Sequence, residues 1–100
     1  RQALDSASAS DTALTNLFTG RPARGIHNRL MRELGPMSAQ APRFPLAGGA
    51  LMPLRAITEA LGSSDFSNLW AGQALRLGRH LSAADLTRDI ADKALARLNR

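Results

Sequence analysis

Apolar residues recur at three- and four-residue spacing along most of the chain, the spacing that gathers side chains on one face of an α-helix. Residues 23–34, 51–61 and 67–80 each carry such a stripe, so each stretch is predicted to form a helix. A last helix has its stripe at Leu86, Ile90, Ala94 and Leu98. Together these patterns predict a mainly helical chain.

Proline and glycine place the boundaries of two of these helices. Pro53 fits the first turn of the 51–61 helix, and Gly62 is a natural stop after it. Gly72 lies near the middle of the 67–80 helix, where a glycine costs about 1 kcal/mol of helix propensity. We therefore expect another group to approach the backbone closely at Gly72.

The last helix carries its own stabilising side chains. Ser82 and Asp85 form an acidic variant of the capping box at its start, and Asp89 and Lys93 pair four residues apart. Three carboxylates, those of Asp85, Asp89 and Asp92, lie on or near one face, with Arg88 and Lys93 among them. This mixture of charges predicts a salt-bridged, solvated face rather than a cation site.

The remaining stretches predict little regular structure. Residues 1–9 fit the end of a helix, and the short polar side chains of Ser8, Ser10 and Asp11 favour a turn after it. Residues 12–19 are the only plausible strand, ended by the turn residues 20–22. Residues 35–50 hold three prolines and a glycine pair, so they are predicted to be a long loop.

Composition narrows the class of protein. The 100 residues suffice for one domain or part of one, and they contain eighteen Ala, sixteen Leu and no Val, which favours helices over strands. The absence of cysteine excludes disulfide scaffolds, and no apolar run has the length of a membrane span, so we expect a soluble, cytoplasmic protein. The net charge of +5 invites a nucleic-acid interpretation, but no three basic residues are adjacent and aromatic residues are few, so no nucleic-acid partner is expected.

No catalytic set of residues emerges from spacing alone. His27 and His80 lack carboxylates at metal-ligand spacing and are predicted to be solvated helix-face histidines. Arg21 and Arg24 flank a turn and a predicted helix start, where they either bind an anion or serve a structural role. Trp70 lies in an apolar stripe and is predicted to pack in the core.

Three segments taken together are more specific than these separate features. They are Phe18-Thr-Gly-Arg-Pro-Ala-Arg-Gly-Ile-His-Asn-Arg-Leu-Met-Arg-Glu33, then Phe44-Pro-Leu with Pro53-Leu-Arg55, then Asp65-Phe-Ser-Asn-Leu-Trp-Ala-Gly-Gln73. In this order they resemble the C-terminal region of bacterial nitronate monooxygenases, formerly called 2-nitropropane dioxygenases. The likeness spans roughly residues 12–98.

The resemblance implies an enzyme of which this chain is one part. Members of that family are FMN-dependent (β/α)8 barrels with a smaller, mainly helical domain near the flavin, and they oxidise alkyl nitronates with O2. Residues 1–19 would then be the end of a barrel helix and a short strand, and residues 20–100 the helical cap and terminal helices. The barrel strands, the phosphate-binding glycines and the catalytic histidine are expected upstream, so the chain's main partner is the rest of its own barrel.

The resemblance also implies roles for three residues. Gly72 and Gln73 match a recurrent Ala-Gly-Gln element and are expected to contact FMN, with Trp70 beside them in the substrate pocket. The alternative for this tetrapeptide is packing against the barrel alone. Arg21 and Arg24 are expected to fasten the cap to the barrel. The chain has no tyrosine, so the substrate contacts that tyrosines make in the family do not transfer.

Other functions remain open at this point. Flavin enoyl-reductases and NADH:quinone reductases share the barrel and a similar Ala-Gly-Gln element, so the resemblance supports flavin use more firmly than reaction type. A free-standing helical module that binds anions or nucleic acid through its arginines is the alternative from a different class. A purely structural helical adaptor is the third.

Overall fold

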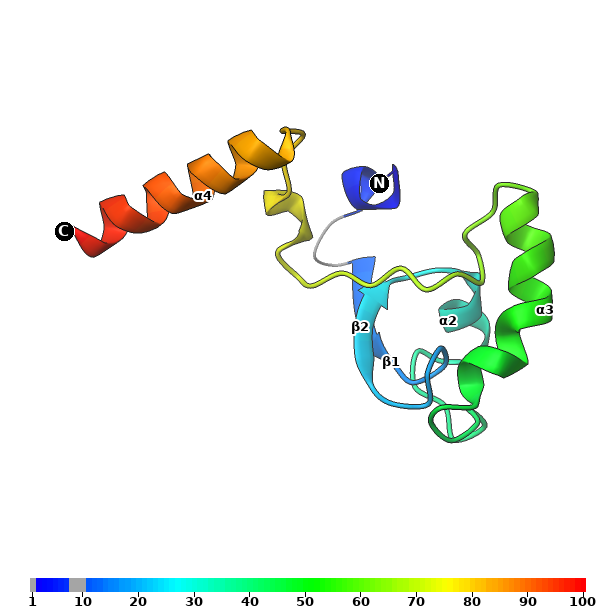
Figure 1. Ribbon diagram of the computed structural model, residues 1–100. Coiled ribbons are helices and arrows are strands. Elements are labelled where there is room, and N and C mark those ends of the chain that lie inside the picture. Colours follow the sequence, from blue (N-terminus) through cyan, green and yellow to red (C-terminus); the bar gives the residue numbers. More distant parts are fainter. Residues whose placement is uncertain (1, 8–10) are drawn as a thin grey trace.

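The computed structural model describes residues 2–7 and 11–100, and it is mainly helical with one small sheet (Figure 1). The elements are α1 (Gln2–Ser6), β1 (Thr12–Thr15), β2 (Ala23–Ile26), α2 (Arg29–Leu34), α3 (Ala47–Ala60), the 3-10 helix η2 (Leu75–Leu77) and α4 (Ala83–Leu98). The helix predicted near the N-terminus is present as α1. The predicted turn at Ser8 and Ser10, like Arg1 and Ala9, lies outside the described residues.

An antiparallel hairpin replaces the first predicted helix. β1 pairs with β2 in a register that puts Thr12 opposite Ile26 and Thr15 opposite Ala23. The prediction of one helix over residues 23–34 was therefore wrong for residues 23–28. The helix begins only at Arg29, after Asn28, whose side chain accepts a hydrogen bond from the backbone N–H of Met31 and so caps α2.

The core lies where the hairpin meets α2. Its buried members are Leu17, Phe18, Leu30, Met31 and Phe66, with Ala13, Ala41 and Leu51 packed against them. Phe18 and Met31 are 2% and 0% exposed. They come from stretches on either side of β2, so the core joins the hairpin to α2.

Helix α3 is longer than predicted. It begins at Ala47 instead of residue 51, so the preceding loop is shorter and Pro53 lies inside the helix rather than in its first turn. The glycine pair that predicted a loop lies in the first turn, where a Cβ at Gly48 would come within 3.3 Å of the Phe18 carbonyl oxygen. At the other end, Gly62 has φ +78°, and the N–H groups of Gly62 and Ser63 bond to the last turn, so the predicted stop is confirmed.

Residues 67–80 do not form the predicted helix. Residues 69–71 bond to β2 around an isolated bridge between Gly25 and Trp70, and the stretch turns helical only over η2. The apolar spacing of this stretch is real, but its backbone groups bond to a strand that lies far away in the sequence. Tertiary pairing has overridden helix propensity here.

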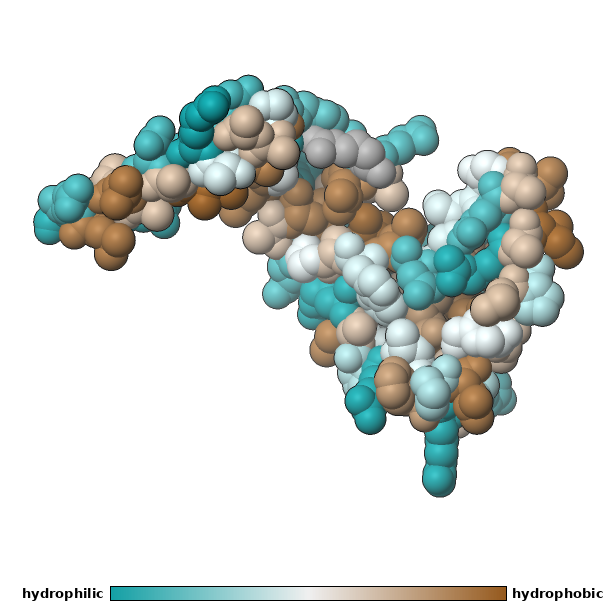
Figure 2. All heavy atoms as spheres, viewed as in Figure 1, coloured by the Kyte–Doolittle hydropathy of each residue, from teal (hydrophilic) through white to brown (hydrophobic). Residues whose placement is uncertain are grey.

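Helix α4 confirms the predictions made for it. Ser82 caps it by accepting a bond from the Asp85 N–H at 3.1 Å, and Lys93 pairs with Asp89 at 3.0 Å. Arg88 pairs with Asp85 at 3.3 Å, so the charged face is salt-bridged as predicted. The helix extends away from the rest of the chain, with its apolar residues exposed along one side (Figures 1 and 2).

The Arg79–Asp89 ion pair gives α4 a testable dependence on pH. Hydrogen bonds from Arg79 and then Lys93 lower the pKa of Asp89 from 3.8 to about 2. Because the folded pKa is depressed, the stabilisation is complete above the ordinary pKa and is lost as pH falls from about 4 to about 2. We expect a pH titration of the intact protein, followed by carbon NMR of the Asp89 carboxyl group, to have its midpoint near the lowered pKa of about 2. A midpoint near 3.8 would show that the ion pair is absent.

Candidate functional site

Residues 69–73, here called the tryptophan segment, lie against the open edge of β2. The Ile26 N–H donates to the Leu69 carbonyl oxygen at 2.8 Å, and the Ala71 N–H donates to the Arg24 carbonyl oxygen at 3.3 Å. These two bonds make up the isolated Gly25–Trp70 bridge and give the hairpin the start of a third strand. The segment that the resemblance singles out is thereby fixed to the first motif.

Gly25 allows this close approach. A Cβ built at Gly25 would lie 3.0 Å from the Leu69 carbonyl oxygen and 3.4 Å from the Trp70 ring. The sequence predicted close approach at Gly72, but among the described residues nothing other than its chain neighbours lies within 4 Å of a Cβ built there. It missed Gly25, which was placed inside a predicted helix. Its only sequence signal is a glycine between Arg24 and Ile26, which is compatible with a strand.

Trp70 is only partly in the core. Its ring meets the buried Phe18 ring edge-on, with centroids 5.7 Å apart and an interplanar angle of 87°. The residue is nevertheless 43% exposed, so the prediction of a core tryptophan was wrong. Contact with Phe18 anchors the ring, while the exposed fraction of the residue leaves apolar surface open to solvent.

Gly72 and Gln73 follow Trp70 on the surface. Both are exposed, and the Gln73 amide makes no hydrogen bond within the described part of the chain. The amide therefore has its donor and its acceptor free. Open space at Gly72 next to a free amide suits a flat polar ligand, whose ring could approach the backbone there.

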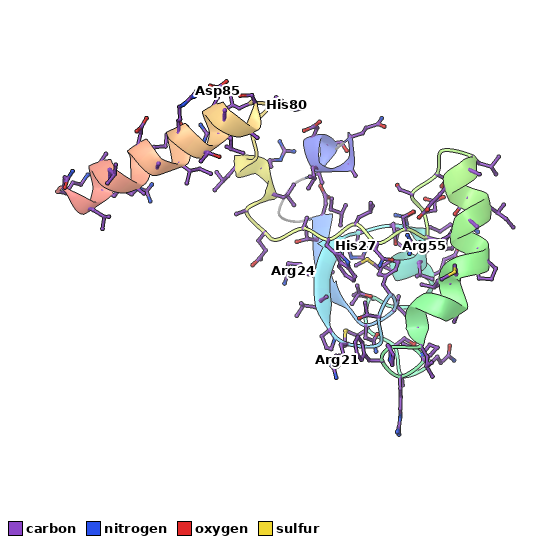
Figure 3. All side chains as sticks on the ribbon, in the orientation of Figure 1. Arg21, Arg24, His27, Arg55, His80 and Asp85 are labelled. Carbon is purple, nitrogen blue, oxygen red and sulfur yellow. The ribbon has the colours of Figure 1, made fainter. Side chains whose placement is uncertain are left out.

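Arg21 and Arg24 of the first motif lie at different places on the hairpin (Figure 3) and have separate partners. The guanidinium of Arg21 lies over the Phe44 ring, 4.0 Å from its centroid. Arg24 donates to the carbonyl and hydroxyl oxygens of Thr12 at 3.3 and 3.1 Å. Arg24 thus ties β2 to β1 within this chain, and the pair does not converge on one anion.

Neither histidine lies on a helix face as predicted. His80 contacts Asp5 of α1 at 2.9 Å, while His27 follows β2 and is half-buried. His27 lines an open cleft of about 620 Å³ between α1 and residues 62–69, together with Arg32 and Asp65. Over residues 2–7 and 11–100, no three His, Cys, Asp or Glu side chains form a metal-binding group.

All three motifs meet at the hairpin. The first motif contacts the second through Arg21 and Phe44, and it contacts the third through Gly25 and Trp70. Segments that are far apart in the sequence are thereby held as one surface.

None of the helices described is long and apolar enough to cross a membrane.

Comparisons with known proteins give a consistent result. A family model for nitronate monooxygenase matches residues 1–93. The chain is 31% identical over 100 residues to a probable nitronate monooxygenase of Staphylococcus saprophyticus, covering all of this chain and 28% of the relative. It is 37% identical over 94 residues to a nitronate monooxygenase of Pseudomonas aeruginosa, covering 93% of this chain and 27% of the relative.

The fold has a solved counterpart. The structure of nitroalkane oxidase from Streptomyces ansochromogenes matches with a TM-score of 0.81 and 38% identity, over 99% of this chain and 28% of that one. The projecting α4 falls within the matched part. The chain thus spans a little over a quarter of the length of the relatives it matches.

Proposed function

This chain belongs to the nitronate monooxygenase family, and from that premise we propose that it forms the C-terminal cap of an FMN-dependent enzyme that oxidises alkyl nitronates with O2. The observation that carries the proposal is the exposed tryptophan segment, fixed on β2 with Gly72 and Gln73 open to a ligand. A family-model match over residues 1–93 supports the reaction class.

The tryptophan segment fits FMN. With no side chain at Gly72, a flat ring can reach the backbone, and the free Gln73 amide can donate to or accept from its polar edge. The outward-facing part of Trp70 offers an apolar wall to the alkyl group of the nitronate. When bound, FMN supplies the transfer of electrons from the nitronate to O2.

The exposed apolar faces of α3 and α4 support the cap assignment. Met52, Ile57 and Leu61 on or next to α3, and Ile90, Leu95 and Leu98 on α4, are more than half exposed. Faces of this kind normally pack against other protein. In our proposal the (β/α)8 barrel of the same polypeptide covers them and supplies the base and the phosphate cradle.

Absorption spectroscopy of the intact protein tests the reaction. We expect a bound flavin, identified as FMN after release, that is bleached anaerobically by an alkyl nitronate and restored by O2. Bleaching by a nicotinamide alone would assign the protein to the related reductases. A colourless protein that takes up no added FMN would contradict the proposal.

Substitutions in the tryptophan segment test the contact itself. Gly72→Ala adds a methyl group where this chain has open space, so it is expected to leave the melting temperature unchanged and to weaken FMN binding about 10- to 100-fold through a clash with the ring. Equilibrium titration with FMN measures the effect.

Gln73→Ala is expected to weaken FMN binding as well. The matched control is Gln40→Ala, in the loop of residues 35–46, where the glutamine is also exposed. Unchanged affinity in both test variants would remove the segment from the flavin site.

A further inference from the structure

We propose that Asn28, Ser67 and Glu59 are positioning residues, which hold the tryptophan segment at the place where it meets the flavin. The inference rests on the proposed function and adds to it residues that do not themselves reach the ligand. Apart from the two backbone bonds to β2 that form the Gly25–Trp70 bridge, the segment belongs to no regular element.

Asn28 fixes the turn that leads into the segment. It is 5% exposed, and its Nδ2 donates to the carbonyl oxygens of Ser64 at 3.1 Å and Ser67 at 2.9 Å. The other atom of the same amide, Oδ1, accepts from the Met31 N–H at 3.4 Å. One buried amide therefore joins the start of α2 to both ends of the 64–67 turn.

A second connection comes from the last turn of α3. The buried Ser67 hydroxyl donates to Oε1 of Glu59 at 2.6 Å, and Arg55 donates to the same oxygen at 3.0 Å. These two bonds lower the pKa of Glu59, the Ser67 bond having the larger effect. The carboxylate thus stays ionised at neutral pH, when its bond to Ser67 is strongest.

Both connections meet at Ser67, two residues before Leu69. Its carbonyl is held by Asn28 and its hydroxyl by Glu59, so the residue is fixed from α2 and from α3 at once. Because Asn68 alone separates Ser67 from Leu69, a displacement of Ser67 also displaces the start of the tryptophan segment. Misplacement of a ligand contact by about 1 Å can cost on the order of 100-fold in rate.

Single substitutions in the intact protein separate positioning from folding. Ser67→Ala and Glu59→Ala each remove the link to α3, whereas Glu59→Gln keeps an oxygen that accepts from Ser67. Asn28→Asp keeps the cap on Met31 but loses both donors to the turn. Thr58→Ala is the matched control, because the Thr58 hydroxyl bonds only to carbonyl oxygens of its own helix.

Two readouts are needed, hydrogen exchange of residues 68–74 and equilibrium titration with FMN. In Ser67→Ala and Glu59→Ala we expect both the exchange rate and the dissociation constant of FMN to rise about tenfold, the size expected for a lost hydrogen bond to a charged group. Asn28→Asp is expected to act in the same direction. Thr58→Ala is expected to match the wild type, and Glu59→Gln, which keeps an accepting oxygen but loses the charge, is expected to show a smaller rise than Glu59→Ala. With a nitronate as substrate, KM is expected to rise more than kcat falls.

The outcomes separate the inference from the proposed function. A wild-type protein without flavin would overturn both, before any variant is made. A flavin-bound wild type whose Ser67→Ala variant shows unchanged exchange would overturn the inference alone. Faster exchange with unchanged FMN affinity and kinetics would also overturn it, because the placement of the segment would then not matter to the site.

Discussion

Phe18→Ala is expected to lower the free energy of unfolding by about 3–5 kcal/mol, the loss typical of truncating a buried aromatic side chain. Phe18 is 2% exposed, packs in the core cluster, and meets the Trp70 ring edge-on. Truncation removes that ring contact as well as the buried area. Urea unfolding of the intact protein, followed by far-UV circular dichroism, measures the change.

A control separates lost volume from a lost aromatic contact. Phe18→Leu keeps most of the buried volume and is expected to cost less than half as much, but it removes the ring that Trp70 meets. We therefore expect Phe18→Leu to affect FMN affinity more than stability. A loss below about 1 kcal/mol for Phe18→Ala would contradict the position of Phe18 at the centre of the core.

Gly20→Ala is expected to cost about 2–5 kcal/mol, because two effects add. Gly20 has φ +91°, a conformation that disfavours any side chain. A Cβ there would also lie 2.3 Å from the Phe44 nitrogen and 2.6 Å from the Pro42 carbonyl oxygen. These are backbone atoms and cannot rotate away, so the contact between the first two motifs has to open. Urea unfolding again gives the free-energy change.

Two other glycines serve as controls for Gly20. Gly62 has φ +78° with nothing within 4 Å of a Cβ, so Gly62→Ala is expected to cost only the conformational part, about 1–2 kcal/mol. Gly49 lies in α3 with a helical backbone and open space, and Gly49→Ala is expected to stabilise by about 0.5–1 kcal/mol. Equal losses at positions 20 and 62 would show that the close approach to Phe44 does not exist.

Features decided by neighbouring residues were predictable from the sequence. The stop at Gly62 and the cap at Ser82 depend on bonds made within a few residues, and both were placed correctly. The exposed, salt-bridged face of α4 was predicted for the same reason. In each case the side chain and its partner lie within one or two helical turns.

Features decided by distant residues were not predictable in this way. The stretches 23–26 and 67–80 both have helical spacing, but each makes backbone bonds to the other, and these bonds outweigh intrinsic propensity. The same holds for the candidate site. The resemblance pointed to Trp70, Gly72 and Gln73, whereas the connections made by Asn28 span 36 and 39 positions and leave no local pattern.

The pairing of Gly25 with Trp70 also has a consequence for the order of events on the ribosome. The two residues are 45 positions apart, so the hairpin is complete before α3 and the tryptophan segment have been synthesised. Until then the outer edge of β2 has no partner from the segment, and an open strand edge can recruit strands of other chains. A chain stalled or truncated before residue 69 would keep that edge unpaired. The tryptophan segment therefore pairs with the sheet edge as well as forming the proposed ligand surface.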